Sequence, residues 1–547
     1  MKQHWSKQLG NVSNDSLEET WEIIADTFKQ HITNHDKPAL AKKWMVLSPP
    51  TGAGKTQSTI LYCSMLSDLP DSLHPGVIII TRLTEDCDEI ARQINELGSR
   101  PTAISFHSKQ NTVTHADLKH YPVIVITHRA YEQALDFLGP EGTIQTTWPL
   151  FHEFGTVREE IRWSENVSSD YAESGTRKLV IVDEALDIID HSQASLDDIR
   201  QTIGLIPQWI RDRHPREMLG VESTVNYLER IATRPGKKLE TMQTNGEPSL
   251  DGNETFLPDL KPLIDDFSKI RFDHKQHGKD DPELNNKLRR YHSQVFRDLH
   301  HIFRTWCYYG KYKTDHTLNT ARLLIPEGVK GAVVLDATAS TSVVYELHAD
   351  AEMIPTPDNC RTYQNVTCHV SRGHNVGKNH MVKSSKQGTS DLMQELEKMI
   401  TGKDRNIFIV CHKKVEPNLL GFKTSFNYMT GHWGSIDGSN TFRDCDTVVI
   451  YGFPYLPDYW TANVYMALQQ PQDTEWLQDA SRRQYGDHAD IRAALKNGQI
   501  STNIIQAINR IRSRKVIDTV GNCPHAEIYI LLPQAAIPRV PGNAVIA

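Results

Sequence analysis

The sequence lacks the features of a membrane protein or a disulfide-rich protein. Its 547 residues include eight cysteines and no Cys-x-x-Cys pair, a pattern that favours reduced thiols in a cytoplasm. No apolar run reaches the roughly 18 residues that a bilayer crossing needs. The first 20 residues are polar and acidic, unlike a secretory signal. We therefore expect a cytoplasmic protein without a membrane partner.

The sequence also lacks a large excess of charge of either sign. The formal net charge is −8, with 38% hydrophobic and 23% charged residues, which is the composition of an ordinary globular protein. The length suffices for roughly three or four domains. A globally basic nucleic-acid-binding protein is excluded, so any nucleic-acid contact must come from a local basic groove.

A short apolar stretch at 45–47 leads into a loop that contains glycines. The loop consists of Pro50, Thr51, Gly52, Ala53, Gly54, Lys55 and Thr56. Gly52 and Gly54 allow a tight backbone whose N–H groups point at phosphate oxygens. Lys55 would reach the β- and γ-phosphates, and Thr56 would bind Mg²⁺ at the positive end of a helix. The sequence therefore predicts a site for ATP and Mg²⁺.

Four continuous apolar runs, at 77–80, 123–126, 179–182 and 333–335, each end in polar residues. Such runs are typical of strands that are buried on both faces of a parallel sheet. Because they alternate with helical segments, they predict a doubly wound α/β fold. Ligands bind at the carboxyl ends of such strands. The residues at these ends are Thr81 and Arg82, Thr127 and His128, Asp183 and Glu184, and Asp336 to Ser340.

Asp183 and Glu184 have two interpretations. An acidic pair after a strand can cap the next helix. A carboxylate at this position can also hold Mg²⁺, directly or through water, and the next carboxylate can deprotonate an attacking water. The phosphate loop earlier in the chain favours the metal and base roles.

Residues 191–319 interrupt the alternation, since a simple crossover needs little more than a dozen residues. We predict a mainly helical insertion, with helices within 195–232 and 287–306. The second helix could grip single-stranded nucleic acid through basic and aromatic groups, or it could pack an apolar stripe beneath a solvated basic face. The groups concerned are Arg289, Arg290, Arg297, Arg304, Tyr308, Tyr309, Lys311 and Lys313.

These stretches resemble the motifs of superfamily 2 DExD/H-box helicases. The loop at 50–56 resembles their phosphate loop, and Val-Asp-Glu-Ala-Leu at 182–186 resembles the DEAx motif. The stretches at 336–340, 430–440 and 506–514 resemble motifs III, V and VI. The resemblance implies an α/β fold of two RecA-like P-loop NTPase lobes, with the insertion in the first lobe. It also implies an ATP-dependent helicase or translocase.

The resemblance assigns roles to particular residues. ATP would be bound by the loop residues Pro50 to Thr56 and by Asp437, with Mg²⁺ on Thr56 and Asp183. Hydrolysis would use Lys55, Glu184, Gln506, Arg510 and Arg512, although Arg512 and Arg514 both remain candidates for the second arginine. Nucleic acid would be bound by Thr81, Arg82, Thr127 and His128. Hydrolysis and motion would be coupled by Asp336, Thr338 and Ser340.

The motif V stretch is similar to that of the XPD/DinG branch, which favours DNA over RNA. No cysteine lies between 88 and 184, so we expect no iron–sulfur cluster of the kind that this branch carries. An alternative is an ATP-driven switch that docks a partner protein, such as a separate nuclease, through the insertion. The expected domains are an N-terminal helical segment at 1–42, the first lobe at 43–190 and 320–345, the insertion at 191–319, the second lobe at 346–535 and a tail at 536–547.

Overall fold

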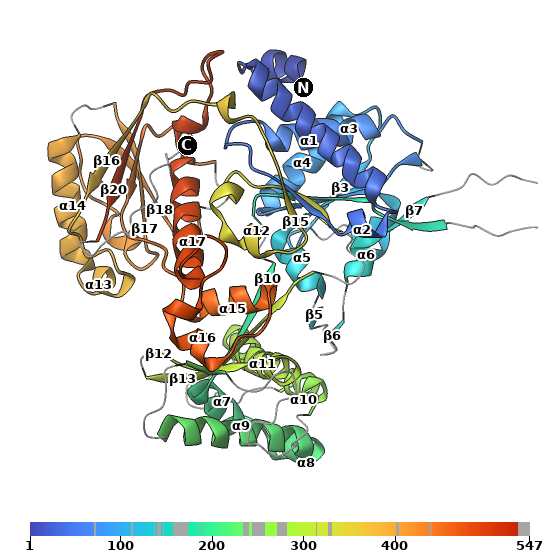
Figure 1. Cartoon of the computed structure of the whole chain (residues 1–547), viewed down its shortest axis with the longest axis vertical. Helices are drawn as coiled ribbons and strands as arrows, with labels where there is room; N and C mark the ends of the chain where they lie inside the picture. Colours follow the sequence, from blue (N-terminus) through green and yellow to red (C-terminus); the bar gives the residue numbers. More distant parts are fainter. Residues whose placement is uncertain are drawn as a thin grey trace, which may run out of the picture.

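The structure is a computed structural model (Figure 1). It describes residues 1–70, 73–110, 113–135, 137–138, 144–145, 147–156, 173–185, 188–233, 240–242, 258–270, 282–312, 314–325, 331–400, 404–436, 438 and 440–533. Within these ranges, no helix is both long enough and apolar enough to cross a membrane.

The first lobe is built on a parallel sheet of seven strands. Their order across the sheet is β15-β1-β14-β9-β2-β4-β3, and all pairs are parallel. Every residue of the central strands β2 and β9 is buried, as the apolar runs predict. The strands are β1 (Trp44–Leu47), β2 (Val77–Thr81), β3 (Ala103–Phe106), β4 (Val123–Thr127), β9 (Leu179–Asp183), β14 (Ala332–Leu335) and β15 (Ala351–Ile354).

Helices and two small hairpins complete the first lobe. The helices are α1 (Asp15–Asn34), α2 (Pro38–Ala41), α3 (Lys55–Leu66), α4 (Thr84–Leu97), α5 (His128–Leu135), α6 (Trp148–His152) and α12 (Val343–Leu347). The hairpins pair β5 (Phe137–Leu138) with β6 (Ile144–Gln145), and β7 (Glu153–Thr156) with β8 (Glu173–Thr176). Because β15 pairs with β1, with Ala351 opposite Trp44, the predicted end of this lobe at residue 345 was too early.

The insertion lies at the bottom of Figure 1 and combines helices with a sheet. Its helices are α7 (Leu196–Gly204), α8 (Gln208–Arg213), α9 (Pro215–Thr233), α10 (Lys261–Phe267) and α11 (Pro282–Arg304). An antiparallel sheet in the order β10-β13-β12-β11 was not predicted. Its strands are β10 (Ile189–Ser195), β11 (Glu240–Met242), β12 (Tyr308–Tyr312) and β13 (Asp315–Leu323). The two longest, β10 and β13, are rich in polar residues, which hid the strand pattern.

The packing interpretation of α11 holds for its apolar stripe. Phe296, Leu299 and Phe303 belong to the core of the insertion. Tyr308 and Tyr309, the aromatic groups of the nucleic-acid interpretation, are fully buried. Lys313 lies outside the described residues. These two tyrosines therefore cannot stack on nucleic acid in this conformation.

The second lobe has a parallel sheet of five strands in the order β16-β20-β19-β17-β18. The strands are β16 (Val366–Ser371), β17 (Asn406–Cys411), β18 (Asn427–His432), β19 (Thr447–Ile450) and β20 (Ala526–Leu531). The helices are α13 (Lys378–Lys383), α14 (Ser385–Met399), α15 (Tyr459–Leu468), α16 (Thr474–Gln478) and α17 (Ile491–Ile508). The predicted fold class, two α/β lobes with an insertion in the first, is therefore confirmed.

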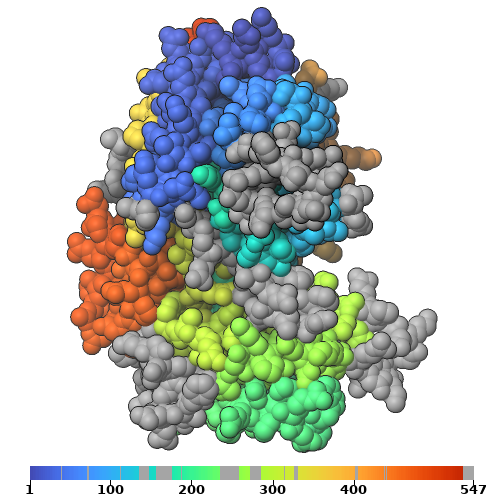
Figure 2. Space-filling model, turned by 90° about the vertical axis from the view of Figure 1, so that its right-hand side faces the viewer, coloured from blue at the N-terminus to red at the C-terminus, as the bar shows by residue number. Residues whose placement is uncertain are grey.

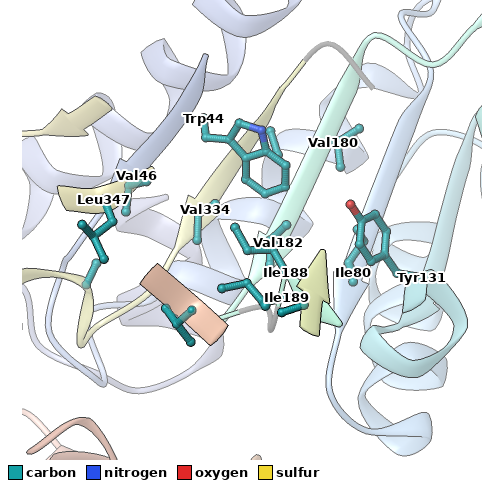
Figure 3. Packing of buried hydrophobic residues seen from close by; sticks show 14 of the residues in the cluster. Trp44, Val46, Ile80, Tyr131, Val180, Val182, Ile188, Ile189, Val334 and Leu347 are labelled. Carbon is teal, nitrogen blue, oxygen red and sulfur yellow. The ribbon is translucent and has the colours of Figure 1, made fainter. Parts of the chain in front are cut away.

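The helices α15 to α17 join the two lobes and the insertion. Ala462, Trp476 and Leu495 share one apolar core with the lower face of the first sheet, and Figure 3 shows part of that core around Trp44, Val182 and Ile188. From α15, Asn463 donates a hydrogen bond of 3.1 Å to the carbonyl of Thr320 in β13. This helical part of the predicted second lobe therefore packs mainly outside that lobe's own sheet.

Candidate nucleotide site

A cavity of about 600 Å³ lies between the lobes, at the carboxyl ends of the first sheet. Its first-lobe lining includes Thr51, Gly52, Gly54, Lys55, Thr56, Thr81, Arg82, Asp183, Glu184, Asp336 and Thr338. Its second-lobe lining includes Gly438, Asn440, Gln506, Asn509, Arg510 and Arg514. The structure thus brings the phosphate loop and the acidic pair together with Gln506, Arg510 and Arg514, which lie more than 300 positions further along the chain.

The loop before α3 has the backbone that a phosphate site needs. Gly52 and Gly54 adopt left-handed conformations, with φ of 83° and 81°, which glycine adopts at little cost. The helix α3 begins at Lys55, so its first N–H groups face the cavity from a helix N-terminus. Pro50 and Ala53 belong to the loop without lining the cavity.

The Lys55 ammonium group lies within this loop. Its Nζ donates to the carbonyl of Pro49 at 3.1 Å and lies 3.5 Å from that of Pro50. Burial lowers the pKa of Lys55, while the charges of Asp183 and Asp336 oppose this shift. A phosphate group would replace the two carbonyls as the partner of this buried cation, because an anion compensates its charge better than a neutral dipole does.

Thr56 and Asp183 meet at the base of the cavity. The hydroxyl Oγ1 of Thr56 donates to Oδ2 of Asp183 at 2.8 Å. Burial and the nearby charge of Glu184 raise the pKa of Asp183 to about 6. A hydroxyl and a carboxylate are oxygen ligands of the kind that Mg²⁺ prefers beside phosphates, so these residues fit the predicted metal role.

Glu184 stands between the lobes in a strained conformation. Its φ of 70° is unusual for a residue other than glycine and often marks a functional position. The carboxylate lies 3.3 Å from Nε of Arg82 and 3.3 Å from Nη2 of Arg510 on the other lobe. Burial raises the pKa of Glu184, but the charges of Arg510 and Arg82 outweigh it and leave that pKa below its ordinary value. Glu184 is therefore ionised at neutral pH.

The turn after α17 decides between the two candidate arginines. Arg514 lines the cavity, and its Nη1 donates to Oδ1 of Asn440 at 2.6 Å. Nε of Arg512 instead donates to the carbonyl of His525 at 2.6 Å, and Arg512 is not part of the lining. Residues in a 3₁₀ turn rotate by about 120° each, so side chains two positions apart point in different directions. Of the two candidates, only Arg514 lines the cavity, so the geometry favours Arg514 over Arg512 as the second arginine, and that role stays a prediction.

Some buried polar atoms in the second-lobe wall of the cavity have no hydrogen-bond partner among the described residues. They are Nε of Arg510 and Oδ1 of Asn509. Buried polar groups are normally paired, so unpaired atoms at a cavity indicate a place for a polar ligand. Together with Lys55 and the glycine loop, these atoms fit a nucleoside triphosphate.

Arg361, in the segment that joins the lobes, also contacts the phosphate loop. Its guanidinium group donates to the carbonyls of Thr51 and Ser513 and to that of Lys515 at 3.1 Å. The residue is only 6% exposed. It thereby ties the phosphate loop to the turn that carries Arg514. The sequence offers no signal for it, because a single arginine in a linker belongs to no motif.

Two tryptophans from the N-terminal segment support the loop from the other side. Nε1 of Trp21 donates to the carbonyl of Ala53 at 2.7 Å, and the rings of Trp5 and Trp21 lie 5.4 Å apart. Trp5 also lines the cavity. The N-terminal helices cover the top of the first lobe in Figure 2. The spacing of α1 predicts only packing, so this role was missed.

The residues predicted to bind nucleic acid contact other parts of the protein. Thr81 and Arg82 line the nucleotide cavity, and Oγ1 of Thr127 accepts the N–H of Ala130 at 3.0 Å. Nε2 of His128 lies 3.2 Å from the carbonyl of Asp183. Burial and the charge of Arg82 lower the pKa of His128 to about 4, so its neutral ring donates this bond. Their nucleic-acid role stays a prediction.

The residues predicted to couple hydrolysis to motion lie beside the cavity. Oδ1 of Asp336 accepts the N–H of Thr338 at 2.8 Å and its hydroxyl at 2.7 Å. Ser340 is exposed and does not line the cavity. The neighbouring hydroxyl of Thr341 lies 3.4 Å from that of Thr502 on α17, the helix that carries Gln506. Asp437 lies outside the described residues.

No protein-family model matches the sequence, and no curated protein matches it. Solved structures of similar fold include S. tokodaii Xpd4, at 13% identity and a TM-score of 0.45, covering 92% of this chain and 95% of that chain. An XPD helicase has 14% identity and a TM-score of 0.46, with coverage of 94% and 95%. S. cerevisiae Dbp5, solved with RNA and ADP BeF3, has 11% identity and a TM-score of 0.33, with coverage of 97% and 90%. At identities of 11–14%, these similarities concern the fold alone.

Proposed function

We propose that this protein is a nucleic-acid-dependent ATPase that moves along or unwinds nucleic acid, with DNA as the favoured substrate. One observation carries the proposal. Glu184 of the first lobe lies 3.3 Å from Arg510 of the second lobe, in the same cavity as Lys55, Thr56 and Asp183. An ATPase whose hydrolysis moves two lobes needs the base and the arginine on opposite sides of one cleft.

The residues divide the chemistry among them. Mg²⁺ held by Thr56 and Asp183 would neutralise phosphate charge. Lys55, Arg510 and Arg514 bind phosphate oxygens and stabilise the charge that builds up on the transferred phosphoryl group. A γ-phosphate would compete with Glu184 for Arg510. The freed carboxylate can then orient a water and take its proton.

The same competition links hydrolysis to motion. With the γ-phosphate in place, Arg510 and Arg514 hold the second lobe against the first. After hydrolysis that interaction weakens and the lobes can separate. The contact between Thr341 and Thr502 lies on the route from Asp336 to α17, which supports a coupling role for this region.

ATP hydrolysis measured side by side with single-stranded DNA, duplex DNA, RNA and no nucleic acid tests the proposal. We expect Mg²⁺-dependent hydrolysis that rises at least about tenfold with one class of strand, because closing the cleft places the arginines. Equal stimulation by RNA would remove the preference for DNA. Hydrolysis that ignores every nucleic acid would overturn the proposal and favour the ATP-driven switch with a protein partner.

The two arginines of the turn form a matched pair for a second test. Arg514→Ala is expected to lower kcat at least about a hundredfold, because it removes a cation from the wall of the phosphate site. Arg512→Ala is expected to change kcat by less than about threefold, since Arg512 contacts the carbonyl of His525 outside the cavity. Steady-state hydrolysis checks both variants. A larger loss of kcat in Arg512→Ala than in Arg514→Ala would instead assign the role of second arginine to Arg512.

A further inference from the structure

A hollow of about 190 Å³ separates the first lobe from the insertion. We propose that it binds one backbone phosphate of the nucleic-acid strand, an inference that rests on the proposed function. Three arginines from three elements line it: Arg129 of α5, Arg297 of α11 and Arg322 of β13. The rest of the lining is Glu132, Gln133, Ile189, Asp190, Gln294 and Leu324.

Two of the three arginines have a carboxylate of their own. Nε and Nη2 of Arg322 lie 3.1 and 3.0 Å from Oδ2 of Asp190. Nη1 of Arg129 lies 3.0 Å from Oε2 of Glu132. Both carboxylates that line the hollow are therefore already paired with a guanidinium group.

Arg297 is the third cation. Its Nε is buried and has no hydrogen-bond partner in the part of the chain that the structure describes. Burial lowers the pKa of Arg297, while Asp190 and Asp298 oppose the shift. Burial also raises the pKa of Asp298 to about 7, so this neighbour carries only part of a charge at neutral pH. The hollow thus keeps a positive charge that no carboxylate in its lining matches.

The chemistry of the hollow favours phosphate as the ligand. A guanidinium group binds phosphate through two parallel N–H donors, and such charge-assisted bonds are short and strong. The volume is below the roughly 300 Å³ at which pockets begin to enclose whole small molecules. Because the side chain of Arg129 is 71% exposed, the hollow is open to a chain that passes outside. One phosphate of a nucleic-acid strand fits the guanidinium donors, the small volume and the open side of the hollow.

The position of the hollow agrees with the proposed motor. Arg129 directly follows Thr127 and His128, the pair for which the sequence predicts contact with the nucleic-acid backbone. Those two side chains are buried, whereas Arg129 reaches the surface one position later. Arg297 and Arg322 belong to the insertion, which would give the insertion a direct part in holding the strand. The ring of His128, next to Arg129, in turn donates to the carbonyl of Asp183.

Fluorescence anisotropy with fluorescein-labelled oligothymidylate and oligouridylate, each over a series of salt concentrations, tests the site on the full chain. Arg297→Ala is expected to weaken binding of the preferred oligonucleotide about tenfold, the value of a hydrogen bond between charged groups. The slope of log affinity against log salt should become shallower by about one. Arg297→Lys keeps the positive charge but lacks the two parallel N–H donors of a guanidinium group. It is therefore expected to recover part of the lost binding affinity.

Arg200→Ala is the control, because Arg200 is an exposed arginine of the insertion that pairs with Glu229 on the surface. Its binding should equal that of the wild type, and thermal denaturation should show Arg297→Ala to be folded. Unchanged binding in Arg297→Ala, an equal loss in Arg200→Ala, or a loss without a change in salt slope would overturn the assignment. So would binding of inorganic phosphate that depends on Arg297 while oligonucleotide binding does not.

The two proposals fail in different ways. A wild-type protein that binds neither oligonucleotide, and whose hydrolysis responds to neither, contradicts the proposed function itself. A wild-type protein that binds strands and is stimulated by them, while Arg297→Ala behaves identically, contradicts only the phosphate site.

Discussion

Glu184→Gln is expected to lower kcat for ATP hydrolysis about a thousandfold, within the range that a positioned general base contributes. Glutamine keeps the shape of the side chain and can still accept a hydrogen bond from Arg510. It cannot take a proton from water. Nucleotide affinity should stay within about threefold of the wild type, because Lys55, Thr56 and the glycine loop are unchanged.

Steady-state hydrolysis and equilibrium binding of a fluorescent ATP analogue measure the two quantities separately. Glu96→Gln is the matched control, since Glu96 pairs with Arg92 on the surface of α4 and both changes remove one negative charge. We expect the control to hydrolyse ATP at the wild-type rate. Glu184→Gln protein that keeps a tenth or more of the activity would refute the role of Glu184 as base.

Gly52→Ala is expected to lower kcat/KM at least about a hundredfold, because it disturbs both the phosphate loop and the contact between the lobes. A Cβ at this position would overlap the carbonyl oxygen of Arg514 and lie 2.8 Å from Nη1 of Arg361. The clash is with backbone, which cannot yield unless the turn that carries Arg510 and Arg514 moves away. The φ of 83° adds strain for any residue with a side chain.

Gly421→Ala is the control that separates the effect of backbone strain from the effect of the steric clash at Gly52. Gly421 has a similar φ of 87°, but a Cβ there would meet no atom within 4 Å. Both variants should lose about 1–2 kcal/mol of stability through backbone strain, seen as a lower melting temperature. Only Gly52→Ala should lose hydrolysis. If the two variants hydrolyse ATP equally well, close contact between the glycine loop and the arginine turn is not needed for activity.

Local patterns were sufficient for the parts of the site that lie within one stretch of chain. The phosphate loop, the acidic pair after β9 and the buried strands could be predicted because each needs a few residue types at fixed spacing. Gly52 and Gly54 have the left-handed backbone that the loop chemistry requires. Thr56 and Asp183, 127 positions apart, meet because β1, which leads into the loop before Thr56, and β9, which ends at Asp183, both pair with β14 in one parallel sheet.

Other features depend on contacts between distant segments, and these escaped prediction. The direction of Arg512 and Arg514 follows from a 3₁₀ turn whose geometry the motif does not encode. Arg361 contacts three backbone carbonyls. Because every residue has a carbonyl, the sequence does not indicate which ones an arginine will contact. The sheet of the insertion is covered by α11 and α15, so its strands need no apolar pattern of their own to be buried.

Sequence patterns alone were enough to predict two α/β lobes, with a glycine loop and an acidic pair at the ends of two strands of the first lobe. They were sufficient because strand burial and phosphate-loop conformation are set by residues close together in the chain. The folded chain was needed to show which arginine lines the cavity, which residues connect the lobes, and that three arginines of different elements converge beside α5. Those outcomes depend on how the lobes and the insertion pack, and packing is a property of the whole chain.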